Sequence, residues 1–209
     1  MSGWASDRRL LLAAALPIGL GVFGFGALWG PWSPLALDAA DARYLAGDAE
    51  SALVAYAAIA DGWYTPTTRA QAATRAGLLA LQRDDANTAV AWLRRALALE
   101  PEAGERAALG SRLAGLYLDT FGDPARAAEA WEQVALDLGT AAGGALASAA
   151  TCWERAERPD RAREAWIRAS AVLRLSAETD GSAREVAQAG LERVEAALTA
   201  AALTATDGA

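Results

Sequence analysis

Hydrophobic and polar residues divide this chain into two parts. The first part is an uncharged run of 20 residues from Leu10 to Trp29, which is about the length that crosses a bilayer. From about residue 35 onward, apolar residues recur at helical spacing between charged positions, and short turns containing Gly, Asp or Pro interrupt them. The pattern predicts one N-terminal membrane helix followed by a series of short helices.

The clearest regularity is the series Gly77, Asp85, Ala89, Ala96 and Pro101. Their offsets are those of positions 8, 16, 20, 27 and 32 in a 34-residue repeat. Small residues let two antiparallel helices approach closely, and Pro ends the second helix. In these residues the chain resembles the tetratricopeptide repeat (TPR) family, over about 140 residues. The resemblance implies an all-α solenoid of helical hairpins.

We predict about four such repeats and a C-terminal capping helix. The anchor alanines of the second helices are 37, 38 and 35 residues apart, and they are Ala52, Ala89, Ala127 and Ala162. Because these spacings exceed 34, the loops between repeats must hold extra residues. We expect the extra residues in the stretch 100–104 and at Gly143–Gly144. In the third repeat, we place Gly115 at the helix contact.

The expected boundaries are a cytoplasmic tail (1–9), a membrane helix (10–30), a linker (31–34), repeats (35–176), the capping helix (177–203) and a tail (204–209). Ser182 and Glu185 have the spacing of a capping box at the start of the last helix. One apolar stripe follows, formed by Val186, Leu191, Val194 and Leu198. A stack of repeats needs such an end helix to cover its last apolar surface.

The charges around the uncharged run predict its orientation. Arg8 and Arg9 precede the run directly, and the first charges after it are Asp38 and Asp41. The positive-inside rule therefore predicts a single-pass protein of a bacterial inner membrane. Its N-terminus would be cytoplasmic, and its repeats would be periplasmic.

A cleaved signal peptide is the alternative to this anchor. Its apolar core would have about 7–15 residues, and Trp29-Gly30-Pro31-Trp32 is a poor cleavage site. We therefore favour an uncleaved anchor. Small residues in the span allow close packing against another membrane helix, although Gly is common in membrane helices in general. These residues are Ala15, Gly19, Gly26 and Gly30.

Composition excludes several kinds of chemistry. All 19 basic residues are Arg, and the chain has neither His nor Lys. The commonest general base, most zinc sites and Schiff-base chemistry are therefore absent. Cys152 is the only cysteine, and its apolar neighbours favour a packed thiol. The net charge of −7 disfavours nucleic acid as a partner. We expect no enzyme, no cofactor and no metal site.

Aromatic residues recur in the second helices of the repeats. Tyr56, Trp131 and Trp166 occupy equivalent positions, with Trp92 one residue away from that register, and we assign this stripe to the core. In the TPR family, partners usually bind in the groove that the first helices line. The resemblance implies these groove residues: Asp41, Tyr44, Thr74, Leu78, Gln82, Arg112, Leu116, Asp119, Thr151 and Arg155. The alternative is that these residues form only a solvated face.

One N-terminal span followed by periplasmic repeats resembles, in layout, the ancillary translocon subunit family. The resemblance implies a non-catalytic scaffold or accessory subunit of a larger inner-membrane complex, for translocation, respiration, photosynthesis or envelope assembly. The expected partners are proteins of that complex, bound through the groove and the membrane helix, together with membrane lipid. The alternative is a periplasmic chaperone that holds unfolded clients in an apolar groove around Leu78, Leu81 and Leu116.

Overall fold

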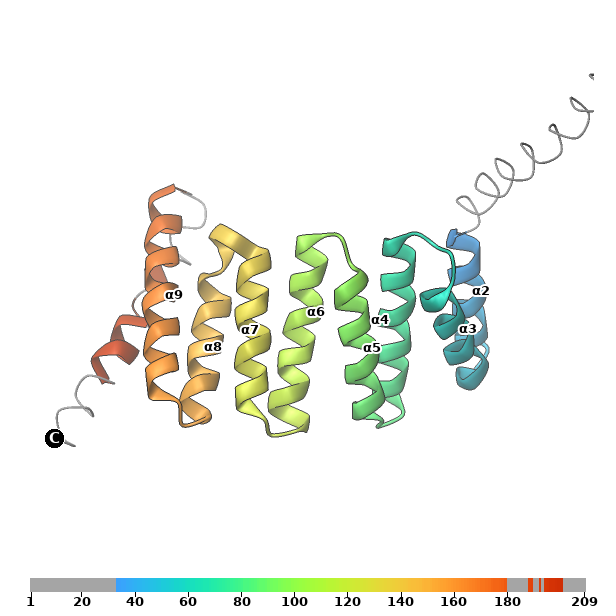
Figure 1. Cartoon of the computed structure of the whole chain (residues 1–209), viewed down its shortest axis with the longest axis horizontal. Helices are drawn as coiled ribbons and strands as arrows, with labels where there is room; N and C mark the ends of the chain where they lie inside the picture. Colours follow the sequence, from blue (N-terminus) through green and yellow to red (C-terminus); the bar gives the residue numbers. More distant parts are fainter. Residues whose placement is uncertain (1–32, 180–187, 190–191, 193, 201–209) are drawn as a thin grey trace, which may run out of the picture. The chain divides into compact units, whose positions relative to one another are not determined.

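The computed structural model describes residues 33–179, 188–189, 192 and 194–200, and all regular structure in these ranges is helical (Figure 1). The predicted membrane helix 10–30, with its small residues Ala15, Gly19, Gly26 and Gly30, lies outside the described residues. Among the helices that are described, none combines the length and the apolar character needed to span a membrane. The chain divides into two compact units between Ala76 and Gly77.

The first unit contains α2 (Ser33–Leu45), α3 (Ala49–Asp61) and the first part of α4 (Pro66–Gln82). Helices α2 and α3 pack against each other as an antiparallel pair (Figure 1). Helix α2 begins at Ser33, within the segment 31–34 that the sequence analysis assigns to a linker. A proline is well tolerated in the first turn of a helix, where its missing N–H would have no partner anyway.

The second unit holds the remainder of α4 and all later helices. These are α5 (Ala86–Leu99), α6 (Ala103–Gly115), the π-helix η1 (Leu116–Thr120), α7 (Pro124–Leu138), the 3₁₀-helix η2 (Gly139–Ala141), α8 (Gly143–Arg155) and α9 (Pro159–Thr179). Neighbours in sequence pack together: α6 with α7, α7 with α8, and α8 with α9. The expectation of a loop at Gly143–Gly144 is wrong, because α8 begins there and η2 makes the connection. The described residues thus form TPR-like helical hairpins.

The predicted small-residue register is confirmed in the second repeat. Ala89 and Ala96 are fully buried, and a Cβ placed on Gly77 would lie only 2.9 Å from Cγ of Leu93. Leu93, and not Trp92, occupies the aromatic position of this repeat and is also fully buried. The alanines Ala52, Ala127 and Ala162 are buried as predicted. Close helix contact therefore explains the alanine pattern.

Each repeat has a turn between its first and second helix, and the four turns in the described part share one backbone feature. One residue of each turn has a positive φ, namely Gly47 (83°), Asp84 (57°), Gly122 (60°) and Glu157 (57°). The next residue in the first three turns is an Asp whose carboxylate accepts a hydrogen bond from a backbone N–H. These N-caps are Asp48, Asp85 and Asp123, and Arg158 takes the same place in the fourth turn. Hydrogen bonds from Ser51 and Thr88 lower the pKa of Asp48 and Asp85, respectively.

The third repeat contains the one clear departure from the predicted register. A Cβ on Gly110 would lie 2.6 Å from Cγ2 of Val134, whereas one on Gly115 would meet only Asp119 at 4.0 Å. The assignment of Gly115 to the helix contact is therefore wrong. Ala114, which is fully buried, corresponds to Gly77. Asp123, the N-cap of the third repeat, is thus nine residues after Ala114, whereas Asp85 in the second repeat is eight residues after Gly77.

The π-helix η1 accommodates this additional residue, because a π turn holds one residue more than an α turn. The hydrogen bonds that close the turns show the same shift. The N–H of Asp85 donates to the carbonyl of Ala80, five residues back, whereas the N–H of Asp123 donates to Tyr117, six residues back. Part of the excess spacing between repeats thus lies inside a helix, not in a loop.

Of the predicted capping helix 177–203, residues 177–179 form the end of α9, and residues 188–189, 192 and 194–200 are also helical. Val194 is buried, and Glu195 pairs with Arg174 of α9 at 2.8 Å. Ser182, Glu185, Val186 and Leu191 lie outside the described residues. The segment 194–200 therefore contacts α9.

Candidate functional site

The predicted groove residues of the first unit are partly engaged within the fold. Asp41 on α2 accepts a 2.6 Å hydrogen bond from the Tyr56 hydroxyl on α3 and pairs with Nε of Arg75 on α4 at 3.1 Å. Burial, and then the hydrogen bond to Asp41, raises the pKa of Tyr56. Tyr44 is exposed, and the Thr74 hydroxyl donates to the Ala70 carbonyl. Asp41 is therefore a structural tie between three helices.

The predicted groove residues of the second unit include three charged side chains, Arg112, Asp119 and Arg155. Leu78, Leu116 and Thr151 are half-buried, whereas Gln82, Arg112, Asp119 and Arg155 are exposed. No ion pair within the described ranges involves Arg112, Asp119 or Arg155. These charged groups are not used in holding the described fold together.

Asp119 and Arg155 lie near the same buried thiol. Burial raises the pKa of Cys152 most strongly, the positive charge of Arg155 lowers it, and the negative charge of Asp119 raises it. Charges from η1 and from α8 thus both act on the Cys152 thiol. The thiol itself is buried, as the sequence predicted, and a raised pKa keeps it protonated.

The additional residue in η1 changes which residues correspond between the second and third repeats. Thr74 and Leu78 in the second repeat correspond to Ser111 and Gly115, one residue before Arg112 and Leu116. The hydroxyl of Ser111 donates to the carbonyl four residues back, as the hydroxyl of Thr74 does. Because Gly115 has no side chain, open space lies beside Asp119. Whether any of these residues contacts a partner stays a prediction.

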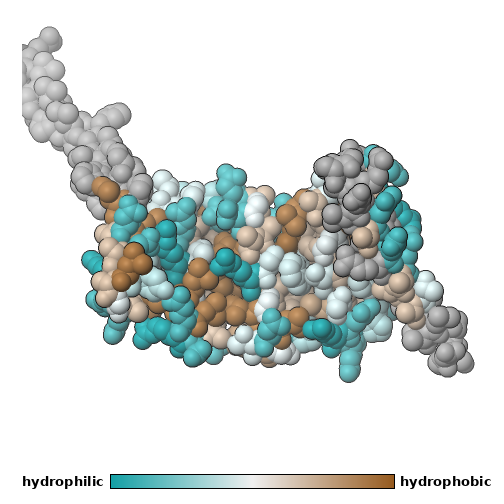
Figure 2. Space-filling view, turned by 180° about the vertical axis from the view of Figure 1, so that it is seen from behind, coloured by the Kyte–Doolittle hydropathy of each residue, from teal (hydrophilic) through white to brown (hydrophobic). Residues whose placement is uncertain are grey.

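The surface that a partner would meet is chemically mixed. Figure 2 shows one face of the molecule, on which hydrophobic side chains gather in patches between hydrophilic ones. Large hydrophobic residues that are more than half exposed include Leu45, Val54, Trp63, Leu136 and Ile167. These residues come from different helices and loops.

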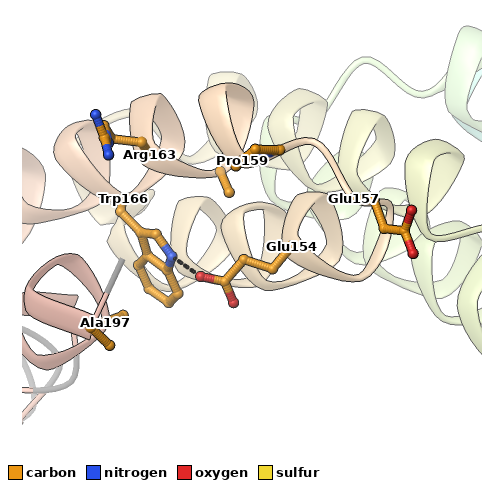
Figure 3. A pocket seen from close by; sticks show the side chains of 8 residues that line it. Glu154, Glu157, Pro159, Arg163, Trp166 and Ala197 are labelled. Atoms are coloured by element: carbon orange, nitrogen blue, oxygen red, sulfur yellow. Dashed lines mark hydrogen bonds between the residues drawn. The ribbon is translucent and has the colours of Figure 1, made fainter. Parts of the chain in front are cut away.

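One open pocket of about 450 Å³ lies where the α8–α9 turn meets residues 197–200 (Figure 3). Its lining residues are Glu154, Glu157, Pro159, Ala162, Arg163, Trp166, Ala197 and Ala200. The indole N–H of Trp166 donates a 2.8 Å hydrogen bond to Glu154, which fixes the ring against the pocket. Sequence reasoning assigned Trp166 only to the core. No local pattern links it to Ala197, which is 31 residues further along the chain.

The described residues include no group of His, Cys, Asp and Glu side chains that could hold a metal ion. The charged groups of the pocket are two carboxylates and one guanidinium. Such groups bind charged or polar side chains through hydrogen bonds and ion pairs.

Comparison with known proteins finds partial similarity to solved structures. No protein-family model matches the chain, and no curated protein matches it. A putative kinesin light chain of Podosopora anserina with nearly identical TPR-like repeats has a TM-score of 0.49 and 18% identity, covering 77% of this chain and 84% of that chain. A structure of MamA has a TM-score of 0.42 and 19% identity, covering 74% and 91%. Similarities of this size do not extend to function.

Proposed function

We propose that the chain is a non-catalytic protein-interaction subunit, anchored by residues 10–30 in a bacterial inner membrane with its repeats in the periplasm. Within a larger membrane complex it acts as an accessory or assembly subunit. The observation that supports this most directly is the first-helix surface around Asp119 and Arg155. Both side chains are exposed, and neither forms an ion pair in the described part of the chain.

An interface gains specificity when charges of both signs meet complementary charges on the partner. Asp119 supplies a negative group and Arg155 supplies a positive group, and Gly115 adds no side chain of its own beside Asp119. A second, apolar contact through the membrane helix would raise the overall affinity, because one bound contact increases the effective concentration of the partner at the other.

The test is affinity purification of the full chain in mild detergent, followed by mass spectrometry. A stable subunit recovers the same partners in fixed proportion. The double variant Asp119→Arg with Arg155→Glu keeps the net charge and should lose those partners. The matched control is Arg94→Glu with Glu129→Arg, which swaps two exposed charges on second helices and should retain them.

Deletion of residues 1–32 should weaken recovery strongly, because it removes the membrane contact. If the swapped-charge variant recovers every partner at wild-type yield, the first-helix surface is not the binding site. A broad and variable set of unfolded clients would instead indicate the chaperone function. The half-buried Leu78 and Leu116 expose little of the apolar surface that a chaperone requires.

Topology is tested separately. Protease added to spheroplasts should digest the repeats and spare the segment before residue 33. Replacing Arg8 and Arg9 by Glu should weaken or scramble the orientation. Full protection of the repeats in intact spheroplasts would contradict a periplasmic location.

A further inference from the structure

The loop between α3 and α4 presents a tryptophan to the solvent. Trp63 is 93% exposed, more than any other large hydrophobic residue among those described. An indole ring buries a large apolar area when it finds a partner, so full exposure leaves that stabilisation unused. Within the described residues, no surface covers the Trp63 ring, so an apolar partner surface would be stabilised by contact with it.

Local contacts hold the loop in a defined conformation. A Cβ on Gly62 would lie 2.8 Å from a ring carbon of Tyr64, so the Tyr64 ring folds back over Gly62. The backbone N–H of Gly62 also donates to the carbonyl of Ile59. With its neighbour turned inward, Trp63 is the side chain that projects.

The start of α4 is fixed to the end of α3 as well. Nε of Arg69 donates a 2.9 Å hydrogen bond to the carbonyl of Ala60, and the Thr65 hydroxyl accepts one from the N–H of Thr68. These bonds close both ends of the loop. The exposed position of Trp63 is thus built into the fold.

The loop lies at the end of the first unit where the chain enters it. Because α2 and α3 are antiparallel, the start of α2 at Ser33 and the end of α3 at Asp61 lie at the same end of the pair (Figure 1). The predicted span ends at residue 30, three residues before Ser33, and three residues reach about 11 Å at most. Leu35, at the same end, is 53% exposed.

The two ends of this helix pair differ in charge. Residues 62–68 contain no charged side chain, and Asp61 directly precedes them. At the other end, the exposed Leu45 is surrounded in sequence by Arg43, Asp48 and Glu50. Only the end next to the predicted span combines exposed apolar groups with an uncharged loop.

We propose that the loop of residues 62–65 lies in the interfacial layer of the lipid bilayer, with Trp63 inserted at the level of the headgroups. Tryptophan and tyrosine favour this layer because their rings are apolar and their N–H and O–H groups stay hydrated. The inference rests on the membrane anchor proposed above. A second point of contact fixes how the first unit is held relative to the membrane.

The test uses the full chain reconstituted in phosphatidylcholine vesicles, in a Cys152→Ala background. An environment-sensitive fluorophore is attached at Thr67→Cys, which is exposed and leaves Trp63 in place. The matched probe site is Leu45→Cys, which is 82% exposed at the other end of the helix pair. Lipids carrying a nitroxide at the headgroup serve as quenchers, and flotation of the vesicles reports anchoring.

The emission of the probe at residue 67 should shift to the blue and be quenched by the nitroxide lipid, while the probe at residue 45 should do neither. Trp63→Ser should reduce the quenching at residue 67, and Leu45→Ser should leave it unchanged. Neither substitution should alter the melting temperature, since both side chains are exposed. If the chain floats with the vesicles but the probe at residue 67 is quenched no more than the probe at residue 45, the loop has no lipid contact of its own and only the anchor stands. If the chain fails to float, the anchor fails and this inference fails with it.

Discussion

The hydroxyl of Tyr56 donates a 2.6 Å hydrogen bond to Oδ1 of Asp41, and the same carboxylate oxygen pairs with Nε of Arg75 at 3.1 Å. This network joins α2, α3 and α4 within the first unit. The family resemblance implied that Asp41 contacts a partner. Its carboxylate is instead committed to the fold, so a partner at this position would have to compete with two internal contacts.

Removing the Tyr56 hydroxyl should weaken the first unit. We expect Tyr56→Phe to lower the free energy of unfolding by about 0.5–1.5 kcal/mol, the usual net contribution of a hydrogen bond. Denaturant unfolding followed by circular dichroism measures the change. In a double-mutant cycle with Asp41→Ala, the two effects should be less than additive. Simple additivity would show that the two groups do not interact.

The same bond should give stability a dependence on alkaline pH. Folding raises the pKa of Tyr56 above its ordinary value of 10.0, so the folded state holds the phenolic proton more tightly than the unfolded state. The resulting stabilisation is complete below about pH 10 and is lost as the pH rises further. Between about pH 9 and pH 11, the wild type should therefore lose more stability than Tyr56→Phe. Parallel curves would contradict the assignment.

Two glycines of the third repeat should respond oppositely to alanine. Gly110→Ala places a methyl group 2.6 Å from Cγ2 of Val134 and should destabilise the chain. Gly115→Ala meets open space in a helical conformation and should stabilise it by about 0.5–1 kcal/mol. Thermal unfolding of the full chain in detergent distinguishes the two. The reverse order would restore Gly115 to the helix contact.

The buried alanines of the second helices should not tolerate larger residues. Ala89→Leu and Ala127→Leu should each cost about 1–3 kcal/mol through overpacking, since both alanines are fully buried. Ala108→Leu, at an exposed position of α6, is the matched control and should change little. Unfolding midpoints in urea provide the comparison. Wild-type midpoints for both buried variants would disprove the packing described here.

The fourth turn lacks the capping Asp of the other three turns, and it also lacks the glycine that the first and third turns have at positive φ. Glu157 holds a positive φ that Gly47 and Gly122 adopt without strain, and Arg158 replaces a capping Asp. Glu157→Gly should stabilise the chain by about 1 kcal/mol, and Arg158→Asp should add about 0.5–2 kcal/mol through a new N-cap.

The reverse substitution in the third turn provides the control. Gly122→Ala, at a φ of 60°, should destabilise the chain by a similar amount. Melting temperatures of the three variants check the set. A destabilised Arg158→Asp would mean that the fourth turn does not cap its helix as the other turns do.

The sequence by itself determined the features that depend on near neighbours. The turns need a residue with positive φ and an Asp that caps the next helix, and all these groups lie within a few positions of one another. The small residues at Ala89 and Ala96 follow from the same short repeat. The membrane span and its orientation rest on composition and flanking charge, and they stay predictions.

Only the tertiary structure decided which small residue meets the neighbouring helix in the third repeat. Gly110, Ala114 and Gly115 are all small, and the choice depends on where Val134 of α7 packs and on one π turn. The partners of Asp41 lie 15 and 34 residues away, and Ala197 reaches the pocket beside Trp166 from another helix. Such contacts depend on how helices pack in three dimensions, and a local pattern carries no information about distances between residues far apart in the chain.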